Sequence, residues 1–518
     1  MNSSPDIAQS VDVLIAGAGP VGLTAALLLQ RLGLTVEIVD QRDGPQRAPA
    51  AHVVNARTFE VWRQIGLDLD RILAMAKDPA DAGAVHWVTK LGGEVIGSLP
   101  FERQGDEVYA LTPTPLRNLS QHKLEPLLRD ELARVGVTVR YGHRWESAEQ
   151  DDTAVRSVIE RAGAAATVTS RWLLACDGAG SPVRRWLGIE PIGPRVLQHF
   201  VMVHLDANFR TMVKDAPGVL YWVCDTASGG VFVAHDIDSE WVYMLPFDPE
   251  LENAAAFTVE QCEGLVRSAL ADHEAEFSVR AVGTWTMTAQ VAERYREGRA
   301  FLVGDAAHRF PPTGGLGLNT GVQDAHNLGW KLAAVESGTA TDELLDTYEA
   351  ERRPVAQHNA DVSLENAAKL IEVPVAIEEG GDVGTAIAHQ ATHFDMLGLQ
   401  LGFVYDAGVD PVREYVPTNR PGARLPHGWV ERAGTTISTL DLVPLAGPIL
   451  LLGPEAAGPG PEHAANLEIL RIGIDVHDPN GWWNETLAMA RDAALYIRPD
   501  QHIGTAPATS SNTGPRAR

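Results

Sequence analysis

The first forty residues constrain the fold more than any other part of the chain. Residues 11–16, VDVLIA, form a short apolar run typical of a buried strand. The run leads into GAGPVG at residues 17–22, then into an apolar helical stretch at residues 23–32. A second strand follows at residues 36–39 and ends at Asp40. This order of strand, glycine-rich turn, helix, strand and acid predicts a βαβ unit that binds a dinucleotide.

The three glycines of this unit have separate expected roles. Gly17 permits the tight turn, Gly19 lets the backbone approach a pyrophosphate, and Gly22 lets the helix pack closely on the strand. A carboxylate at Asp40 is placed to accept hydrogen bonds from a ribose diol. The predicted contacts in this unit are Gly17, Gly19, Pro20, Val21, Gly22, Asp40, Gln41 and Arg42.

A second glycine-rich segment lies at residues 300–333. An apolar strand at residues 300–303 ends at Gly304 and Asp305, and a loop rich in proline and glycine follows. From Thr320 the apolar positions recur at helical spacing. A strand, a carboxylate, a glycine-rich loop and a helix N-terminus together suit a large anionic cofactor. The alternative is an ordinary strand–loop–helix connection rich in turn residues.

Charge and cysteine content exclude several classes of protein. The 518 residues include 68 acidic and 42 basic side chains, a formal charge of −26, which opposes binding to nucleic acid or anionic lipid. Cys176, Cys224 and Cys262 have neither the spacing of a metal site nor the even number of a disulfide framework. Residues 1–9 do not resemble a signal peptide, and the apolar run at residues 442–452 is too short to cross a bilayer. We therefore expect a cytoplasmic protein without a metal, a nucleic acid partner or a membrane partner.

Residues 190–290 have the alternating pattern of β-strands. Apolar residues recur with period two at 201–205 and 241–245, with further strand-like runs at 219–223 and 231–234. We expect a mostly antiparallel sheet that covers a ligand. Helices are expected at residues 52–67 and from Ser120 onward.

Three separated motifs together resemble a known family. They are the Gly17–Gly22 turn with Asp40, the Asp177–Gly178 pair after a strand, and Gly304–Asp305 before the glycine-rich loop. This combination is similar to the single-component FAD-dependent aromatic hydroxylases, the para-hydroxybenzoate hydroxylase and phenol hydroxylase group, over about residues 11–405. The segments PPTGGLGLNTG and LGLQLGFVYD look most like bacterial hydroxylases of phenols and aromatic polyketides.

The resemblance implies a set of cofactor contacts. Asp305 would hold the ribityl chain of FAD, the backbone of residues 317–320 would bind the flavin ring, and Asp177 would bridge the FAD domain and the site of the reduced nicotinamide. Gln121 and, less directly, Arg117 resemble flavin contacts. Asp177 could instead be a turn residue, and Gln121 only a helix-start residue. The residues that the resemblance adds to the cofactor site are Arg47, Arg117, Gln121, Asp177, Gly304, Asp305, Pro312, Gly315, Gly317, Leu318, Asn319 and Thr320.

One position departs from the family pattern. Many relatives carry an arginine in the loop before the NxRT sequence, where this chain has Ala50. Arg47 lies three residues earlier and is the expected substitute for contact with the cofactor phosphates.

The resemblance also implies the domain organisation of an α/β protein. A Rossmann-like FAD-binding domain carries an inserted, mostly antiparallel substrate domain, a helical segment and a C-terminal thioredoxin-like α/β domain. The C-terminal domain is suggested by residues 420–424, 438–441 and 498–500. It contains no cysteine, which excludes thiol–disulfide chemistry there. Its expected role is packing or dimer stabilisation, so a homodimer is expected. The expected boundaries are FAD-binding 1–83, 113–189 and 291–405 (with the helical segment), substrate-binding 84–112 and 190–290, thioredoxin-like 406–505, and a disordered tail 506–518.

The implied reaction is hydroxylation of a phenolic or polycyclic aromatic compound, using NADPH or NADH and O₂ through a flavin C4a-hydroperoxide. A histidine is the expected base for the phenol, with His52 and His235 as candidates. Tyr221 and Trp222 are neighbours on a strand, so only one of them is expected to line the substrate pocket, together with Pro312 and Gly314. Baeyer–Villiger oxygen insertion and a non-catalytic FAD-binding protein remain alternatives. A flavin halogenase is disfavoured because the WxWxIP sequence is absent.

Overall fold

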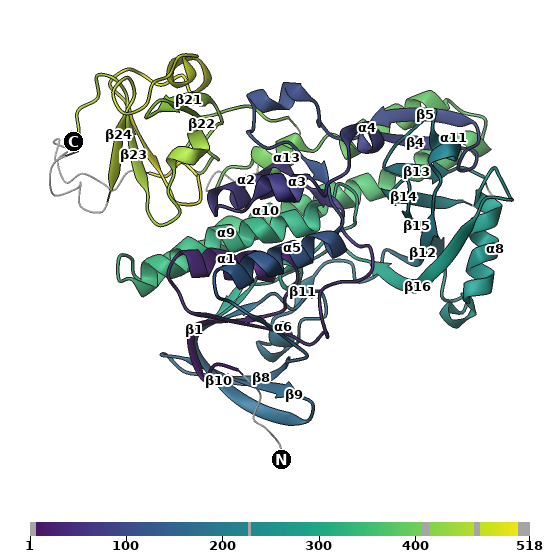
Figure 1. The fold of residues 1–518 in the computed structure, drawn as a ribbon, viewed down its shortest axis with the longest axis horizontal. Coiled ribbons are helices and arrows are strands. Elements are labelled where there is room, and N and C mark those ends of the chain that lie inside the picture. Colours follow the sequence, from purple (N-terminus) through teal and green to yellow (C-terminus); the bar gives the residue numbers. More distant parts are fainter. Residues whose placement is uncertain (1–6, 226–228, 406–413, 460–466, 506–518) are drawn as a thin grey trace, which may run out of the picture.

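The computed structural model describes residues 7–225, 229–405, 414–459 and 467–505 (Figure 1). Within these residues the chain forms two large sheets, a set of long helices and a smaller C-terminal part. The expected tail at residues 506–518 lies outside the described residues.

The first sheet contains the predicted βαβ unit. Its main strands run in the order β18-β19-β10-β1-β2-β7, and β8 and β9 extend β10 as an antiparallel arm. The pairs β1–β2, β1–β10, β2–β7 and β10–β19 are parallel. The strands are β1 (Ser10–Ala16), β2 (Val36–Asp40), β7 (Val139–Tyr141), β8 (Arg144–Gln150), β9 (Val155–Arg161), β10 (Ala164–Ala175), β18 (Arg296–Glu297) and β19 (Ala300–Leu302).

Helices cover this sheet because its strands are apolar on both faces. Val13, Leu14 and Ile15 of β1 are completely buried, as is typical of a parallel sheet covered by helices. Helix α1 (Pro20–Arg31) lies between α9 (Leu316–Glu336) and α5 (Gln121–Arg134), and α10 (Glu343–Lys369) packs on α9 (Figure 1). The other helical segments before residue 405 are α3 (Leu69–Leu73), α4 (Pro79–Ala82), η1 (Asp106–Ala110), α6 (Pro182–Trp186), η3 (Gly304–Ala306), α11 (Glu372–Glu378), α12 (Val383–Ala388), η4 (His389–His393) and α13 (Leu397–Leu401), of which α4, α11 and α12 pack near β4 and β5 of the second sheet.

The second sheet is the predicted antiparallel layer. Its order is β16-β12-β15-β14-β13-β4-β5, and all its pairs are antiparallel except β4–β13. Strands from residues 84–100 and residues 198–287 therefore share one sheet. Its elements are β4 (Ala84–Val88), β5 (Val95–Pro100), β12 (Gln198–Ala207), α7 (Arg210–Val213), β13 (Leu220–Val223), β14 (Gly230–Asp236), β15 (Glu240–Phe247), η2 (Ala254–Ala256), α8 (Val259–Ala269) and β16 (Phe277–Met287).

Two predicted helix boundaries were wrong. The helix expected at residues 52–67 is shorter: Val53–Val54 form strand β3, and α2 spans Ala56–Gln64. Asn55 stops the helix from starting earlier because its side chain accepts the N–H of Thr58 as an N-cap. The helix expected from Thr320 begins earlier, because left-handed Gly315 (φ 62°) ends the loop directly before α9.

The C-terminal part is small and contacts α2 and α9. It contains a sheet in the order β24-β23-β25 and a hairpin of β21 and β22. None of its residues described between 414 and 505 lies in an α-helix. Its elements are β21 (Trp429–Arg432), β22 (Thr435–Ser438), η5 (Thr439–Leu442), β23 (Ile449–Leu452), β24 (Glu468–Arg471), the π-turn η6 (Trp482–Thr486) and β25 (Ala494–Ile497).

Three short strands and one short pair complete the fold. The strands β11 (Pro191–Ile192), β17 (Gln290–Ala292) and β20 (His308–Arg309) form a sheet between the two large ones, and β6 (Arg117–Asn118) pairs with β3. No helix among the described residues combines the length and apolarity that a membrane crossing requires.

Candidate functional site

One cavity connects the two large sheets. It has a volume of 810 Å³, and its wall includes Gly19, Asp177 and Asp305 from the three motifs. These residues come from distant parts of the sequence, and they meet because β1, β10 and β19 are parallel neighbours whose carboxyl ends lie at the same edge. A crevice at this edge is the usual ligand site of such sheets.

The cavity wall includes most of the predicted site residues but not all of them. Those on the wall are Gly17, Gly19, Pro20, Val21, Asp40, Gln41, Arg42, His52, Gln121, Asp177, Trp222, His235, Asp305, Pro312, Gly315, Gly317 and Leu318. Those that do not line it are Gly22, Arg47, Arg117, Tyr221, Gly304, Gly314, Asn319 and Thr320.

Several of the residues outside the wall have local structural roles. Arg47 is 78% exposed and pairs with Asp43 at 2.9 Å, so the structure does not bring it to the cavity as a substitute for the missing arginine. Arg117 donates to the carbonyl oxygens of Gln104 and Leu116. Thr320 donates within its own helix to the Leu316 carbonyl.

Three further glycines allow close packing instead of lining the cavity. A Cβ on Gly22 would lie 2.0 Å from the carbonyl oxygen of Gly17. A Cβ on Gly304 would press on Val21, and one on Gly314 would lie 2.6 Å from Met396. Gly22 therefore permits helix–strand packing, as predicted for the third glycine of the motif.

Gly19 differs from Gly17 and Gly22 of the same turn because open space lies where its Cβ would be. A Cβ built there meets no atom within 4 Å, and its backbone is extended (φ −74°, ψ 179°). It precedes Pro20, the first residue of α1, so the N-terminus of α1 faces the cavity. A helix N-terminus with an open backbone approach suits a pyrophosphate.

A buried ionic cluster lies behind this turn. Asp40 accepts from the Ala18 N–H at 2.7 Å and from the Arg42 guanidinium at 2.9 Å. Arg42 also pairs at 3.1 Å with fully buried Glu125, which accepts from Gln121 Nε2 at 2.7 Å. A ribose approaching Asp40 would therefore meet Arg42 as well, and sequence reasoning did not detect Glu125.

Asp177 carries an unsatisfied oxygen at the cavity. Its Oδ2 accepts from the Val183 N–H at 3.1 Å, whereas buried Oδ1 has no hydrogen-bond partner. Burial raises the pKa of Asp177 to about 6, although hydrogen bonds from Ser181 and Val183 oppose this. An unpaired buried acceptor is costly unless a ligand supplies the donor.

His52 and His235 lie side by side on the wall. Their ring centroids are 5.4 Å apart in an edge-to-face arrangement. His52 Nδ1 lies 2.9 Å from Asn118 Oδ1, and His235 Nδ1 lies 2.5 Å from Ser120 Oγ. The Asn118 side chain occupies Nδ1 of His52, so Nε2 is the ring nitrogen left for a ligand.

Burial keeps both imidazoles neutral. Burial, followed by the charge of nearby Lys77, lowers the pKa of His52 to about 4. Burial, followed by His52 and Lys77, lowers the pKa of His235 well below its usual value. Both side chains are therefore uncharged at neutral pH.

The second sheet supplies an apolar wall, most of which the sequence analysis missed. Trp222 lines the cavity, whereas Tyr221 lies in the core and donates to the Ala216 carbonyl at 2.9 Å. The same alternation holds on β14 and β15, and on β12 the residues 201, 203 and 205 face the core whereas Phe200 and Met202 line the cavity. The missed wall residues are Phe200, Met202, Leu220, Val231, Val233, Val242, Met244, Trp285 and Met287. Apolar residues at successive positions were the available signal, because they mark a sheet buried on both faces.

Two family models cover most of the chain. Residues 10–363 match the model described as FAD binding domain, and residues 418–517 match the one described as aromatic-ring hydroxylase, C-terminal. The fold and the cavity define a flavin-dependent monooxygenase. The chain belongs to the FAD-binding aromatic-ring hydroxylases, as the sequence resemblance predicted.

The chain is similar to several named relatives over almost its full length. It is 33% identical to the tetracenomycin A2 monooxygenase-dioxygenase of Streptomyces glaucescens, covering 96% of this chain and 93% of that protein. It is 31% identical to the 2,4-dichlorophenol 6-monooxygenase of Delftia acidovorans, covering 97% and 96%.

Solved structures agree with this assignment. The flavin-dependent monooxygenase PieE, in complex with FAD and substrate, superposes with a TM-score of 0.89 at 32% identity, covering 97% of this chain and 96% of that one. Aklavinone-11 hydroxylase, in a ternary complex with FAD and aklavinone, gives a TM-score of 0.80 at 30% identity, covering 98% and 97%. This protein is therefore an FAD enzyme that hydroxylates aromatic compounds.

Proposed function

We propose that this enzyme hydroxylates a flat polycyclic phenol of the aromatic polyketide type, with NADPH or NADH as reductant. The observation that carries the proposal is the shape of the cavity: a glycine-rich and acidic region continues into a region walled by aromatic and aliphatic side chains. An apolar wall with few polar groups suits a large aromatic ligand oriented by one polar edge. Aklavinone-11 hydroxylase, solved with aklavinone, is consistent with this class of substrate.

The residues on the wall fit FAD. The open backbone at Gly19 and the N-terminus of α1 would hold the pyrophosphate. Asp40 and Arg42 would act together at the adenosine ribose, and Asp305 would bind the ribityl chain. Asp177 also lines the cavity and would lie beside the cofactor and the nicotinamide.

The backbone at the start of α9 would bind the flavin ring. Gly317 lines the cavity, and a Cβ there would meet only Asp305 Oδ1, at 3.9 Å. The first N–H groups of a helix have no intrahelical partners, so they are available to a ligand and favour negative charge near them. When bound, FAD supplies the oxygen activation that no amino-acid side chain provides.

The histidine pair would manage the substrate hydroxyl. With its proton on Nδ1, His52 would accept a hydrogen bond from the substrate hydroxyl at Nε2, which orients the substrate and increases the electron density of its ring. His235, fixed by Ser120, would orient the same edge of the substrate. The apolar sheet excludes water from the reacting ring.

The test is a comparison of two substrate series with the purified enzyme. We expect tri- and tetracyclic phenols to accelerate NAD(P)H oxidation and to yield a product with one added oxygen, whereas monocyclic phenols give a higher KM. His52→Gln should lower kcat for the polycyclic substrate by about tenfold, because the substrate hydroxyl loses a fixed hydrogen-bond acceptor. Equal efficiency with monocyclic phenols would refute the polycyclic substrate class. Full activity of His52→Gln would refute the role of His52 at the substrate hydroxyl.

A further inference from the structure

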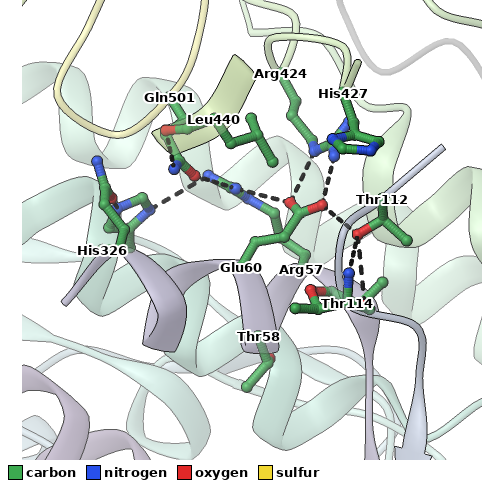
Figure 2. A network of polar contacts seen from close by, with 12 residues as sticks. Arg57, Thr58, Glu60, Thr112, Thr114, His326, Arg424, His427, Leu440 and Gln501 are labelled. Atoms are coloured by element: carbon green, nitrogen blue, oxygen red, sulfur yellow. Dashed lines mark hydrogen bonds and ion pairs between the residues drawn. The ribbon is translucent and has the colours of Figure 1, made fainter. Parts of the chain in front are cut away.

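A fully buried ion network joins the C-terminal part to helix α2 (Figure 2). Glu60 of α2 lies between two guanidinium groups: Arg57 Nη1 at 2.9 Å from Oε2, and Arg424 Nε at 2.8 Å from the same oxygen. A second nitrogen of Arg424 donates to Oε1, which also accepts from Thr112 Oγ1 at 2.6 Å. The side chains of Arg57, Glu60 and Arg424 are at most 1% exposed.

The charges in this network depend on one another. Burial alone would raise the pKa of Glu60, but Arg424 and Arg57 outweigh burial and lower that pKa to about 2. Removal of either arginine would leave a buried charge incompletely paired, which is strongly unfavourable. The bidentate contact of Arg424 also requires the planar guanidinium, which a lysine does not provide.

Backbone and amide groups of the C-terminal part hold the same helix. Arg57 donates to Gln501 Oε1 at 2.7 Å and to the carbonyl oxygen of Asp500 at 2.8 Å. Gln501 in turn donates to the Leu440 carbonyl at 3.0 Å (Figure 2). Arg57 therefore carries a polar link from α2 to the C-terminal part, beside the ionic link that Glu60 makes to Arg424.

The N-terminal turn of α2 is fixed to the loop before α9. Asn319 Oδ1 accepts from the Asn55 N–H at 2.9 Å and from Thr58 Oγ1 at 2.8 Å. Asn319 Nδ2 donates to the carbonyl oxygens of Val53 at 2.9 Å and Gly315 at 2.6 Å. Asn319 thus ties α2 to two cavity-lining segments: the one that follows His52, and the glycine-rich loop.

We propose that Arg424 and Gln501 of the C-terminal part are positioning residues for the flavin-binding start of α9, residues 315–318. Both residues act through α2: Gln501 binds Arg57 directly, and Arg424 binds it through Glu60. The first turn of α2 is in turn hydrogen-bonded through Asn319 to Gly315, at the start of α9. The C-terminal part is then more than a packing module, because its docking sets the backbone that receives the flavin. This inference rests on the FAD site proposed above.

The test measures FAD affinity and the flavin absorbance spectrum of Arg424→Met and Gln501→Met in the full-length protein. The matched control is Arg63→Met, which removes a part-exposed bidentate ion pair with Asp441 (2.7 and 2.8 Å) between the same helix and the same C-terminal part. We expect Kd for FAD to rise about tenfold in the first two variants, within the usual range of coupling between sites, and less than twofold in the control. The melting temperature of the FAD-free protein is recorded for all three.

Each outcome supports or overturns the proposal. If Arg424→Met does not fold, Gln501→Met decides, because it removes hydrogen bonds but no buried charge. Unchanged FAD affinity in the folded variants would overturn the positioning role. It would also be overturned if Arg63→Met lost as much FAD affinity as the other variants for the same fall in melting temperature. Asp305→Asn tests the FAD site independently of the positioning role. If this variant also binds FAD with normal affinity, the proposed FAD site is wrong.

Discussion

The Oγ of Ser120 lies 2.5 Å from Nδ1 of His235, although Ser120 is the N-cap residue of α5 and makes no side-chain cap bond to that helix. A serine at this position usually accepts a hydrogen bond from the helix backbone. Here the hydroxyl instead fixes an imidazole of the cavity wall, so the residue serves the site in preference to the helix.

Ser120→Ala should therefore impair turnover more than stability. We expect kcat to fall about tenfold as His235 loses its orientation, with less than about 1 kcal/mol lost from the free energy of unfolding. The control is Thr258→Ala, whose side chain does cap its helix by accepting the Gln261 N–H. Thr258→Ala should lose stability and keep its turnover. If Ser120→Ala instead lost stability and kept its turnover, Ser120 would be a helix cap and not a residue that orients His235. Product formation and urea unfolding give the two measurements.

Gly17 and Gly19 should respond differently to alanine. Gly17 has φ 101°, and a Cβ would lie 2.2 Å from the Cys176 carbonyl oxygen, so Gly17→Ala should cost about 4 kcal/mol or more of folding free energy. Gly19→Ala should fold normally, because no atom lies within 4 Å of its Cβ. Its methyl group would occupy the approach of the pyrophosphate, so we expect Kd for FAD to rise at least about tenfold. Normal FAD titration of Gly19→Ala would show that the pyrophosphate lies elsewhere.

Trp222 and Tyr221 test the two faces of the second sheet. Trp222→Ala should raise KM for the aromatic substrate by about 10- to 200-fold, the usual effect of lost apolar contact, with little change in the fold. Tyr221→Phe removes the hydrogen bond to Ala216 and should cost about 1 kcal/mol of stability without changing KM. Steady-state kinetics and thermal unfolding of both variants check this, and a KM effect confined to Tyr221→Phe would reverse the assignment of the faces.

Asp177 should make the FAD-free protein less stable as the pH rises. Burial raises its pKa from 3.8 to about 6, so between these values the folded state binds more protons than the unfolded state and the free energy of unfolding falls with increasing pH. Asp177→Asn should remove this dependence and stabilise the FAD-free protein at pH 7 by about 1 to 3 kcal/mol, at 1.36 kcal/mol for each pKa unit. Urea unfolding at pH 4 and pH 7 measures the difference, which should be mostly lost at pH 4 because the stability depends on pH between the two pKa values. A variant that is destabilised at pH 7 would show that the ionised carboxylate contributes favourably.

Local sequence was sufficient for the elements around the cofactor. The strand, glycine turn, helix and acid at residues 11–40 were predicted nearly as they occur, because glycine positions and apolar periodicity act within a few residues. The alternation along residues 198–247 likewise predicted the second sheet. The helix that begins at Ala56 was placed too early, since its start depends on the cap formed by Asn55.

Contacts between distant residues could not be predicted in the same way. Arg47 was expected at the phosphates, but its neighbour Asp43 holds it at the surface. Glu125 behind Arg42 and Arg424 beside Glu60 were not identified as partners, because a carboxylate in a helix pattern gives no sign of being buried or of what it pairs with.

The sequence by itself determined that two glycine-rich turns and an Asp–Gly pair follow strands of one parallel sheet, and with them the family and the cofactor. Only the tertiary structure decided that these turns share one cavity with the apolar face of the second sheet, that Ser120 serves His235, and that the C-terminal part holds α2. The physical reason is range: backbone conformation and periodicity are set by neighbouring residues, whereas the pairing of buried charges and the choice of sheet face depend on segments hundreds of residues apart.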